Sequence, residues 1–388
     1  MTNRLATPPR RWGDPAILAL PHPVRVDAAL GAPVESYVLS QAGVLEAVRP
    51  YLADETVSTE WIVNRVPGML DLALASVGAP AGFNMGILML MLARARLRAH
   101  GDPILQVAPA LQAQLAATDL GAGLPARFFR CPYPFAYLEL ARPSGLAIRN
   151  RASGLHQVEG VYVGSYEVGP EREEPSGRSR ALGLDPARPT RVIELTITGS
   201  PLGKGHALDD ASIDLSLFIQ DEDACLGTLL ERHMDYYRSP AVTAQPGFEA
   251  PAADDMALTR EVILHLAKVL LYLNLPEARQ DPLPERSDLE RRLRGLGKKK
   301  AARILRRMTS AYDRIVIGPR LEVEREEVGN AAGGDADCTV RPHWRRGHFR
   351  RIRYGEGLGA CRLGWIRPVL VNASRAFGAV NAKPYVVR

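Results

Sequence analysis

The residues best suited to chemistry gather near the C-terminus, in the segment CTVRPHWRRGHFRRIRYGEG. It interleaves six arginines and two histidines with aromatic residues, and no acidic residue interrupts it from Arg341 to Tyr354. Guanidinium groups donate paired hydrogen bonds to phosphate, and aromatic rings and guanidinium planes stack on unpaired bases. The composition predicts a surface that binds nucleic acid, RNA in preference to DNA, through Arg341, Trp344, Arg345, Arg346, Arg350, Arg351 and Arg353.

The two histidines of this segment suggest an alternative function. In a continuous strand His343 and His348 face opposite sides, because side chains alternate. A bulge at Gly347 would bring the imidazoles together, as acid and base catalysis in a nuclease requires. Structural hydrogen bonding is the commoner role of a histidine, and an edge strand with solvated arginines is the simpler interpretation. His343 and His348 are therefore candidate catalytic residues of the alternative only.

A second basic segment, LERRLRGLGKKKAARILRRM, precedes the first. Its Gly-Leu-Gly turn at 295–297 resembles the turn of a helix-hairpin-helix module, which holds a phosphate backbone through main-chain amides. The alternative is a solvated amphipathic helix whose core-facing residues are Leu289, Leu293, Ile304, Leu305 and Met308. Both interpretations predict an exposed basic face that includes Lys298, Lys299 and Lys300.

Metal and cofactor sites are not expected. One group of acidic residues could bind Mg²⁺ for phosphoryl chemistry, although charged residues at strand ends are far commoner. The stretch GSPLGKG before His206 lacks the spacing of a phosphate-binding loop. The acidic residues in question are Asp209, Asp210, Asp214, Asp221, Glu222 and Asp223.

The charge of the chain is divided along its length. The net charge is +6 and the isoelectric point is near 9.2. Residues 286–388 hold 24 Lys or Arg against 10 Asp or Glu, a net +14, whereas the first 285 residues hold 25 and 33, a net −8. A segregated basic field of this kind attracts polyanions, and it also suits solubility or an acidic protein partner.

Composition favours a cytoplasmic protein with no membrane segment. The 388 residues are 46% hydrophobic and 24% charged, enough for a substantial core. The longest apolar run, 85–93, is too short to cross a bilayer, and the N-terminus has no apolar signal core. The cysteines form no CxxC pair, which argues against zinc modules and disulfide-rich scaffolds. These cysteines are Cys131, Cys225, Cys338 and Cys361.

Periodicity predicts an α+β fold, in which a helical N-terminal region packs on a mainly antiparallel sheet that the C-terminal strands join. Helices are expected over 61–77, 83–97, 104–115, 225–237 and 256–273, and strands over 135–140, 157–168, 191–198 and 212–219. The expected regions are a helical one at 1–125, a sheet-rich one at 126–240, a linker with an amphipathic helix at 241–285, and a basic one at 286–388.

The tail RLGWIRPVLVNASRAF is expected to place the arginine strand. It should return antiparallel to that strand through the turn YGEGLGA. Trp365 would then fix the strand against the core, while Pro368 limits pairing to an edge or a bulge.

Three patterns together resemble a known family: PYPFAYLEL at 132–140, VLLYLNLPEAR at 269–279, and VRPHWRRGHFRR followed by GWIRPVLVN. The chain resembles bacterial plasmid and phage proteins related to the type V anti-CRISPR protein that lowers the transcript of its target nuclease. The resemblance implies an intracellular mobile-element protein that represses production of the nuclease by engaging mRNA, nascent protein or the ribosome. It supplies no catalytic residues. An alternative is a protein-binding adaptor that captures an acidic or nascent chain on a sheet edge.

Overall fold

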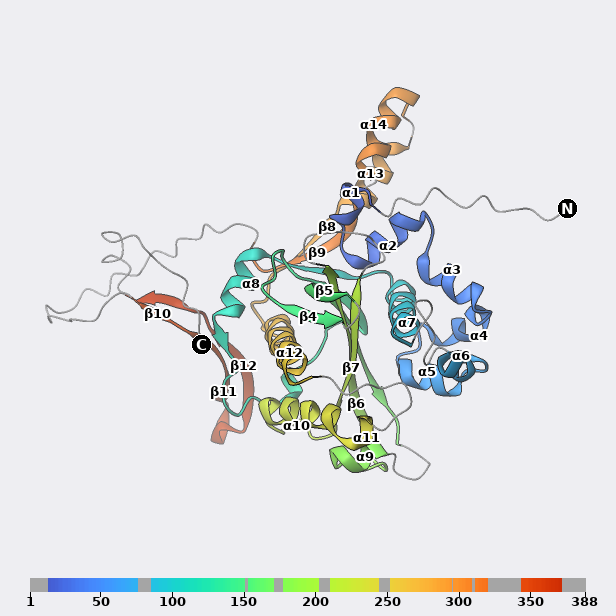
Figure 1. Ribbon diagram of the computed structural model, residues 1–388. Helices are drawn as coiled ribbons and strands as arrows, with labels where there is room; N and C mark the ends of the chain where they lie inside the picture. The colour runs from blue at the N-terminus through green and yellow to red at the C-terminus, as the bar shows by residue number, and fades with distance from the viewer. Residues whose placement is uncertain are drawn as a thin grey trace, which may run out of the picture.

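The computed structural model describes residues 13–75, 85–150, 153–170, 177–201, 210–243, 252–294, 296–308, 311–319 and 343–371. Its centre is an eight-stranded sheet in the order β7-β6-β5-β3-β1-β9-β8, with β4 paired to β5 (Figure 1). Helices cover both faces, so the predicted α+β class is confirmed. The strands are β1 (Ile104–Val107), β3 (Phe135–Glu139), β4 (Ala147–Asn150), β5 (Gly154–Val168), β6 (Thr190–Pro201), β7 (Ala211–Ile219), β8 (Gln280–Pro284) and β9 (Asp313–Ile317).

Most of the sheet is antiparallel, as predicted. Strands β3, β5, β6 and β7 are neighbours in this order, and each neighbouring pair is antiparallel. The exception is β1, which is parallel to both β3 and β9. Strand β8 lies at the edge, where Pro282 and Pro284 remove backbone donors without breaking a central ladder.

The prediction of one helix over 104–115 is wrong. Residues Ile104–Val107 form β1, and helix α8 (Pro109–Ala116) begins only after the extended residue Ala108. Pro109 occupies the first turn, where its missing amide hydrogen costs nothing. A short apolar run fits both helical and strand periodicities, so the pattern could not separate the two elements.

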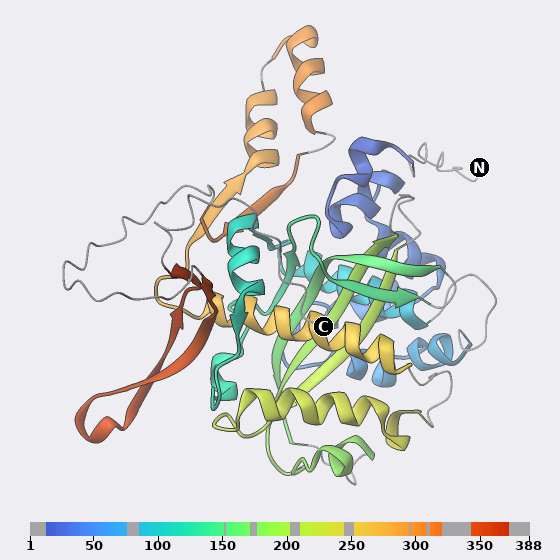
Figure 2. The same cartoon turned by 60° about the vertical axis from the view of Figure 1, so that its left-hand side comes forward.

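One face of the sheet packs against α8, α10 (Leu226–Arg238) and α12 (Ala253–Leu273), and this layer forms the larger core. The other face packs against N-terminal helices, as predicted, and forms a second core that includes Tyr137 and Tyr162. Figures 1 and 2 show α12 and α7 on opposite sides of the sheet. The N-terminal helices are α1 (Pro15–Leu18), α2 (His22–Leu30), α3 (Val34–Gln41), α4 (Leu45–Val48), α5 (Thr59–Arg65), α6 (Met69–Ala75) and α7 (Met85–Ala99); the short helices α9 (Gly177–Leu182) and α11 (Pro240–Thr243) lie beside α10.

A buried ionic network joins α2 to the sheet. Arg25 donates to Glu159 at 2.6 Å and to Asp210 at 2.7 Å, and all three side chains are at most 5% exposed. Arg142 donates to the same Glu159 at 2.6 Å. The nearby Nδ1 of His22 lies 2.8 Å from the Tyr162 hydroxyl, and burial lowers the pKa of His22 to about 3. This network holds the N-terminal helices in place.

Three of the acidic residues that could have bound Mg²⁺ have other partners. Asp210 belongs to the network with Arg25, Asp214 accepts a hydrogen bond from Thr196, and Glu222 pairs with Arg191. Asp209 lies outside the described residues. In the part of the chain that is described, no three His, Cys, Asp or Glu side chains are arranged to hold a metal ion.

Two elements project from the body. Helices α13 (Glu285–Leu293) and α14 (Lys298–Met308) form a hairpin beyond β8 and β9, and strands β11 (Gly347–Tyr354) and β12 (Ala360–Ile366) form a second one (Figure 2). Within the described ranges, no helix combines the length and apolar character needed to cross a bilayer.

Candidate nucleic-acid interface

The predicted return of the C-terminal tail is confirmed. Strands β11 and β12 pair antiparallel from His348 opposite Ile366 to Tyr354 opposite Ala360. A tight turn joins them, with positive φ angles at Gly355 and Gly357 that favour glycine. We call residues 347–366 the arginine hairpin.

The arginine segment is not one continuous strand. Strand β10 (His343–Arg345) pairs with β13 (Val369–Val371), whereas β11 pairs with β12 and with β2 (Thr118–Asp119). Among the described strands of the C-terminal region, only β9 joins the main sheet, so the prediction that these strands join it is confirmed for β9 and wrong for β10 to β13. The physical reason is that the outer half of the arginine hairpin carries exposed arginines, so it has no apolar face to bury against a layer of helices.

The base of the arginine hairpin is fixed by aromatic packing. Phe349 is fully buried and stacks on Trp365, with ring centroids 5.7 Å apart. Trp365 also meets Tyr272 of α12 edge-on at 5.7 Å, and its indole nitrogen donates to the Thr118 hydroxyl at 3.2 Å. The predicted role of Trp365 in fixing the strand against the core agrees with this packing.

Gly347 allows the hairpin to sit close to the body. A Cβ atom at this position would lie 2.7 Å from the Ile366 carbonyl oxygen and 2.7 Å from the Thr118 hydroxyl. The Ile366 backbone cannot move away without breaking the pairing of β11 and β12, and the Thr118 hydroxyl is held by its hydrogen bond to the Gln114 carbonyl. The glycine therefore serves close packing at the point where the sequence suggested a bulge.

The tip of the hairpin presents arginines on both faces. The strand register places Arg350 and Arg362 on one face and Arg351 and Arg353 on the other, and all four are exposed. In the described residues, none of these four has an acidic side chain within ion-pair distance. Glu356 is the only acid between residues 343 and 371.

The base of the hairpin is also electropositive. Arg346 pairs with Asp119 at 3.2 Å, and Lys268 of α12 donates to the Thr118 carbonyl at 3.0 Å. Burial, opposed by Asp119 and assisted by the nearby Arg346, lowers the pKa of Lys268 to about 8. Lys268 was not predicted, because an apolar helix gives no sign that one lysine will face a distant strand.

The structure describes the remaining predicted site residues to different extents. Arg341 lies outside the described residues, and for His343 and Trp344 only the backbone, in β10, is described. Arg345 is exposed in the same strand. His348 is half-buried in β11, on the face that carries Arg350. The histidines belong to different small sheets, and their pairing for catalysis stays a prediction.

The α13–α14 hairpin has a small core of its own. Leu289 and Ile304 are buried between the helices, with Leu293 and Met308 packed beside them. The two-helix hairpin agrees with both interpretations of the sequence. The prediction that Leu305 faces the core is wrong, because its side chain is 51% exposed. At 100° per residue it lies at the margin of the apolar stripe.

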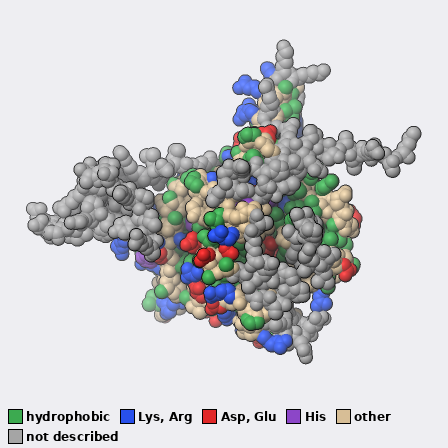
Figure 3. Space-filling model, viewed as in Figure 1, with side chains coloured by type: hydrophobic (Ala, Val, Ile, Leu, Met, Phe, Trp, Pro, Cys, Tyr) green, Lys and Arg blue, Asp and Glu red, His purple; other side chains and the backbone are tan. Residues whose placement is uncertain are grey.

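The outer side of α14 is basic. Helical geometry places five residues within one arc of about 120°: Lys299, Lys300, Arg303, Arg306 and Arg307. Figure 3 shows Lys and Arg side chains along this projecting hairpin. The acids of α13 are each paired, Glu290 with Arg286, Asp288 with Arg291 and Glu285 with Arg314. Lys298 begins the same helix, and the phosphate grip of the 295–297 turn stays a prediction.

Fold and surface together define an α+β protein with two basic projections. The family model for the AcrVA2-like family, Anti-CRISPR type V subtype A2, matches residues 105–373. The chain belongs to this family. A comparison with curated proteins gives no match. A solved structure, the crystal structure of AcrVA2, is similar with a TM-score of 0.44 and 15% sequence identity, over 87% of this chain and 97% of that chain.

Proposed function

We propose that this protein is an anti-CRISPR regulator from a mobile element, which binds nucleic acid through the arginine hairpin and the basic side of α14. The family supports the anti-CRISPR part of the proposal. We propose mRNA of the target nuclease, or its translating complex, as the site of action. The protein acts there by binding rather than by catalysis.

The observation that carries the proposal is the composition of the hairpin tip. Arg350, Arg351, Arg353 and Arg362 project together with no acidic partner among the described residues. Exposed arginines without acidic partners repel one another in the free protein, and phosphate oxygens relieve this repulsion with charge-assisted hydrogen bonds. A polyanion is thus the partner that this surface fits best.

The aromatic content of the tip favours RNA. Tyr354 is 50% exposed beside the arginines, so its ring is available for stacking on an unpaired base. Arginine planes can stack in the same way. The outer side of α14 has no aromatic residue, and we assign it to sequence-independent contacts with phosphates.

Salt-dependent binding tests the proposal. Affinity for a single-stranded RNA and for duplex DNA of equal length is measured between 50 and 200 mM salt by fluorescence anisotropy. The wild-type protein should bind RNA more tightly, with a steep slope of log K against log salt. Replacing Arg350, Arg351, Arg353 and Arg362 with Ala should weaken binding by more than 100-fold and lower the slope by about three to four.

A charge-matched variant provides the control. Arg49, Arg130, Arg238 and Arg260 are exposed arginines elsewhere, each paired with a carboxylate. Their replacement by Ala removes the same net charge and should leave the slope almost unchanged. Equal losses of affinity in both variants would show that net charge alone determines binding. The absence of binding to either nucleic acid at 50 mM salt would refute the proposal.

A second measurement tests whether the protein acts on free mRNA or on the translating complex. RNA that co-purifies with the tagged protein is sequenced from cells with and without a translation inhibitor. Enrichment of the nuclease transcript only during translation supports the translating complex, and enrichment in both samples supports free mRNA. A partner that survives nuclease treatment of the sample favours the protein-adaptor alternative.

A further inference from the structure

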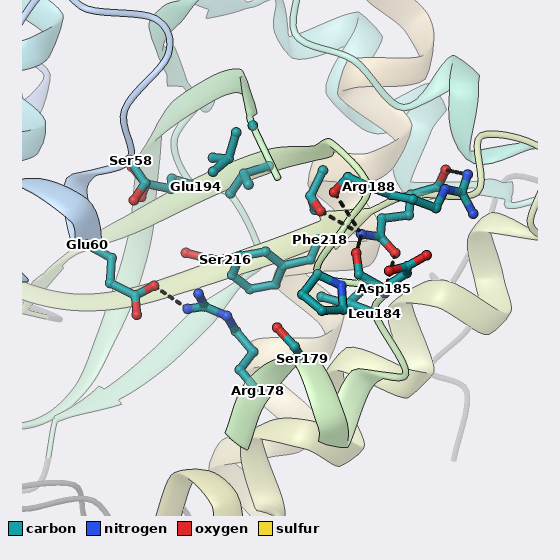
Figure 4. A pocket seen from close by; sticks show the side chains of 16 residues that line it. Ser58, Glu60, Arg178, Ser179, Leu184, Asp185, Arg188, Glu194, Ser216 and Phe218 are labelled. Carbon is teal, nitrogen blue, oxygen red and sulfur yellow. Dashed lines mark hydrogen bonds and ion pairs between the residues drawn. The ribbon is translucent and has the colours of Figure 1, made fainter. Parts of the chain in front are cut away.

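A polar and aromatic cavity lies on the face of the sheet that the N-terminal helices cover, remote from both basic projections. It has a volume of about 490 Å³, within the range of small-molecule sites. Its floor is the outer part of the sheet, and its walls come from α5, α7 and α10. A smaller cavity of about 50 Å³ adjoins it, and Figure 4 shows the residues around that one.

Strand register explains why this part of the sheet is polar. Glu194 and Thr196 of β6 lie opposite Ser216 and Asp214 of β7, so all four share one face. The residues that alternate with them along β6 and β7, such as Leu195, face the larger core instead. The polar positions therefore line a cavity rather than meet a packed helix.

Two carboxylates of the cavity, Glu194 and Asp214, accept hydrogen bonds but form no ion pair with a described residue. Glu194 accepts from the amide and hydroxyl of Thr59, at 3.0 and 2.5 Å. Asp214 accepts from the Thr196 hydroxyl at 2.6 Å through Oδ1, and the described residues give its other oxygen no hydrogen bond. Burial, against the opposing hydrogen bond from Thr196 and with a smaller contribution from the nearby Glu194, raises the pKa of Asp214 to about 7. The side chain remains partly exposed because it borders the cavity.

The contacts of Arg178 show how the residues of this cavity bind a cationic group. Its guanidinium lies 4.3 Å from the centroid of the Phe218 ring and pairs with Glu60 of α5 (Figure 4). These residues line both cavities, so the pair stands between them. A guanidinium on an aromatic ring, next to a carboxylate, is the arrangement expected for recognition of organic cations. Tyr236 and Tyr237 extend the aromatic wall.

We propose that the larger cavity binds a ligand with a guanidinium or primary ammonium group, which pairs with Asp214 and Glu194 and packs against the aromatic wall. Among the described lining residues, three carboxylates face a single cation, Arg178. An anionic ligand would meet repulsion there, and an apolar ligand would leave the carboxylates without partners. The group can belong to a free small molecule or to a basic side chain of a peptide.

Calorimetry with two probes tests this site in the full-length protein. Agmatine represents the free cation, and the capped tripeptide Ala-Arg-Ala represents a side chain; the same tripeptide with citrulline is the uncharged control. We expect saturable binding of at least one of the two cationic probes. The citrulline tripeptide should bind at least tenfold more weakly than that probe. Affinity should rise up to tenfold per pH unit from pH 5.5 to 7 and level off above pH 8, because binding requires the Asp214 carboxylate.

Three variants separate the site from general effects. Asp214→Asn should weaken binding at least tenfold and abolish its pH dependence, whereas Asp235→Asn, at an exposed carboxylate of α10, should change neither. Phe218→Leu keeps an apolar side chain and should weaken binding through loss of the ring. Tighter binding of agmatine points to a free cation, and tighter binding of the peptide points to a side chain. Equal binding of citrulline, no saturation by either probe, or full affinity in Asp214→Asn would overturn the proposal.

Discussion

Phe349 and Trp365 lie on opposite strands of the arginine hairpin and stack with 14° between their ring planes, at the point where the hairpin leaves the body. The stack connects the hairpin to α12 through Tyr272. Because the described residues of the body meet the hairpin only at this base, its orientation depends on a small number of side chains.

Removal of the Trp365 ring should therefore reduce stability more than binding chemistry. We expect Trp365→Ala to lower the free energy of unfolding by about 3 kcal/mol, the usual cost of truncating a largely buried aromatic side chain. Urea denaturation measures the loss, and Trp365→Phe should recover much of it. Nucleic-acid binding, expressed per folded molecule, should remain. A variant that unfolds normally but does not bind would make Trp365 a contact residue.

Arg346→Ala should have the opposite effect. Its ion pair with Asp119 joins side chains that are 61% and 54% exposed, so its loss should change stability by less than about 1 kcal/mol. Binding to RNA should weaken, with a salt slope lower by about one. Anisotropy titrations at several salt concentrations measure both quantities. Arg346→Lys should keep the slope, since the charge remains.

The buried network under α2 should be far more sensitive. Glu159→Gln removes the charge that pairs with Arg25 and Arg142, and leaves a guanidinium buried with fewer partners. We expect a loss of about 3–5 kcal/mol, typical of breaking a buried pair. Glu46→Gln, at a carboxylate that is 81% exposed, is the matched control and should have little effect. Similar melting temperatures for both variants would contradict this assignment.

His265 should make the protein sensitive to acid. It is 5% exposed on α12, its Nε2 has no partner among the described residues, and burial lowers its pKa to about 4. A lowered pKa gives stability that is present above pH 6.5 and is lost as the pH falls towards 4, by up to about 3 kcal/mol. His265→Leu should stabilise the protein at pH 7 and flatten the decline between pH 6.5 and 4. Denaturation at several pH values measures this, and parallel pH curves would exclude it.

The local elements were predictable where periodicity and turn residues agree. The β11–β12 hairpin followed from alternation and a glycine-rich turn, and α12 from its long apolar stripe. The network of Arg25 and Glu159 was not predictable, because 134 positions separate its partners and charged residues are usually exposed. The cavity left a weak signal in the polar alternate positions of β6 and β7, but an exposed sheet face gives the same pattern.

The length of β11 limits the footprint of the hairpin on a partner. Eight residues at about 3.3 Å each extend about 26 Å, and successive nucleotides of a strand stacked as in B-form DNA are about 3.4 Å apart along the axis. A strand that follows the hairpin from base to tip would thus cover about seven or eight nucleotides. Oligonucleotides shorter than that should lose affinity with each nucleotide removed, whereas longer ones should gain only from the additional places at which they can start.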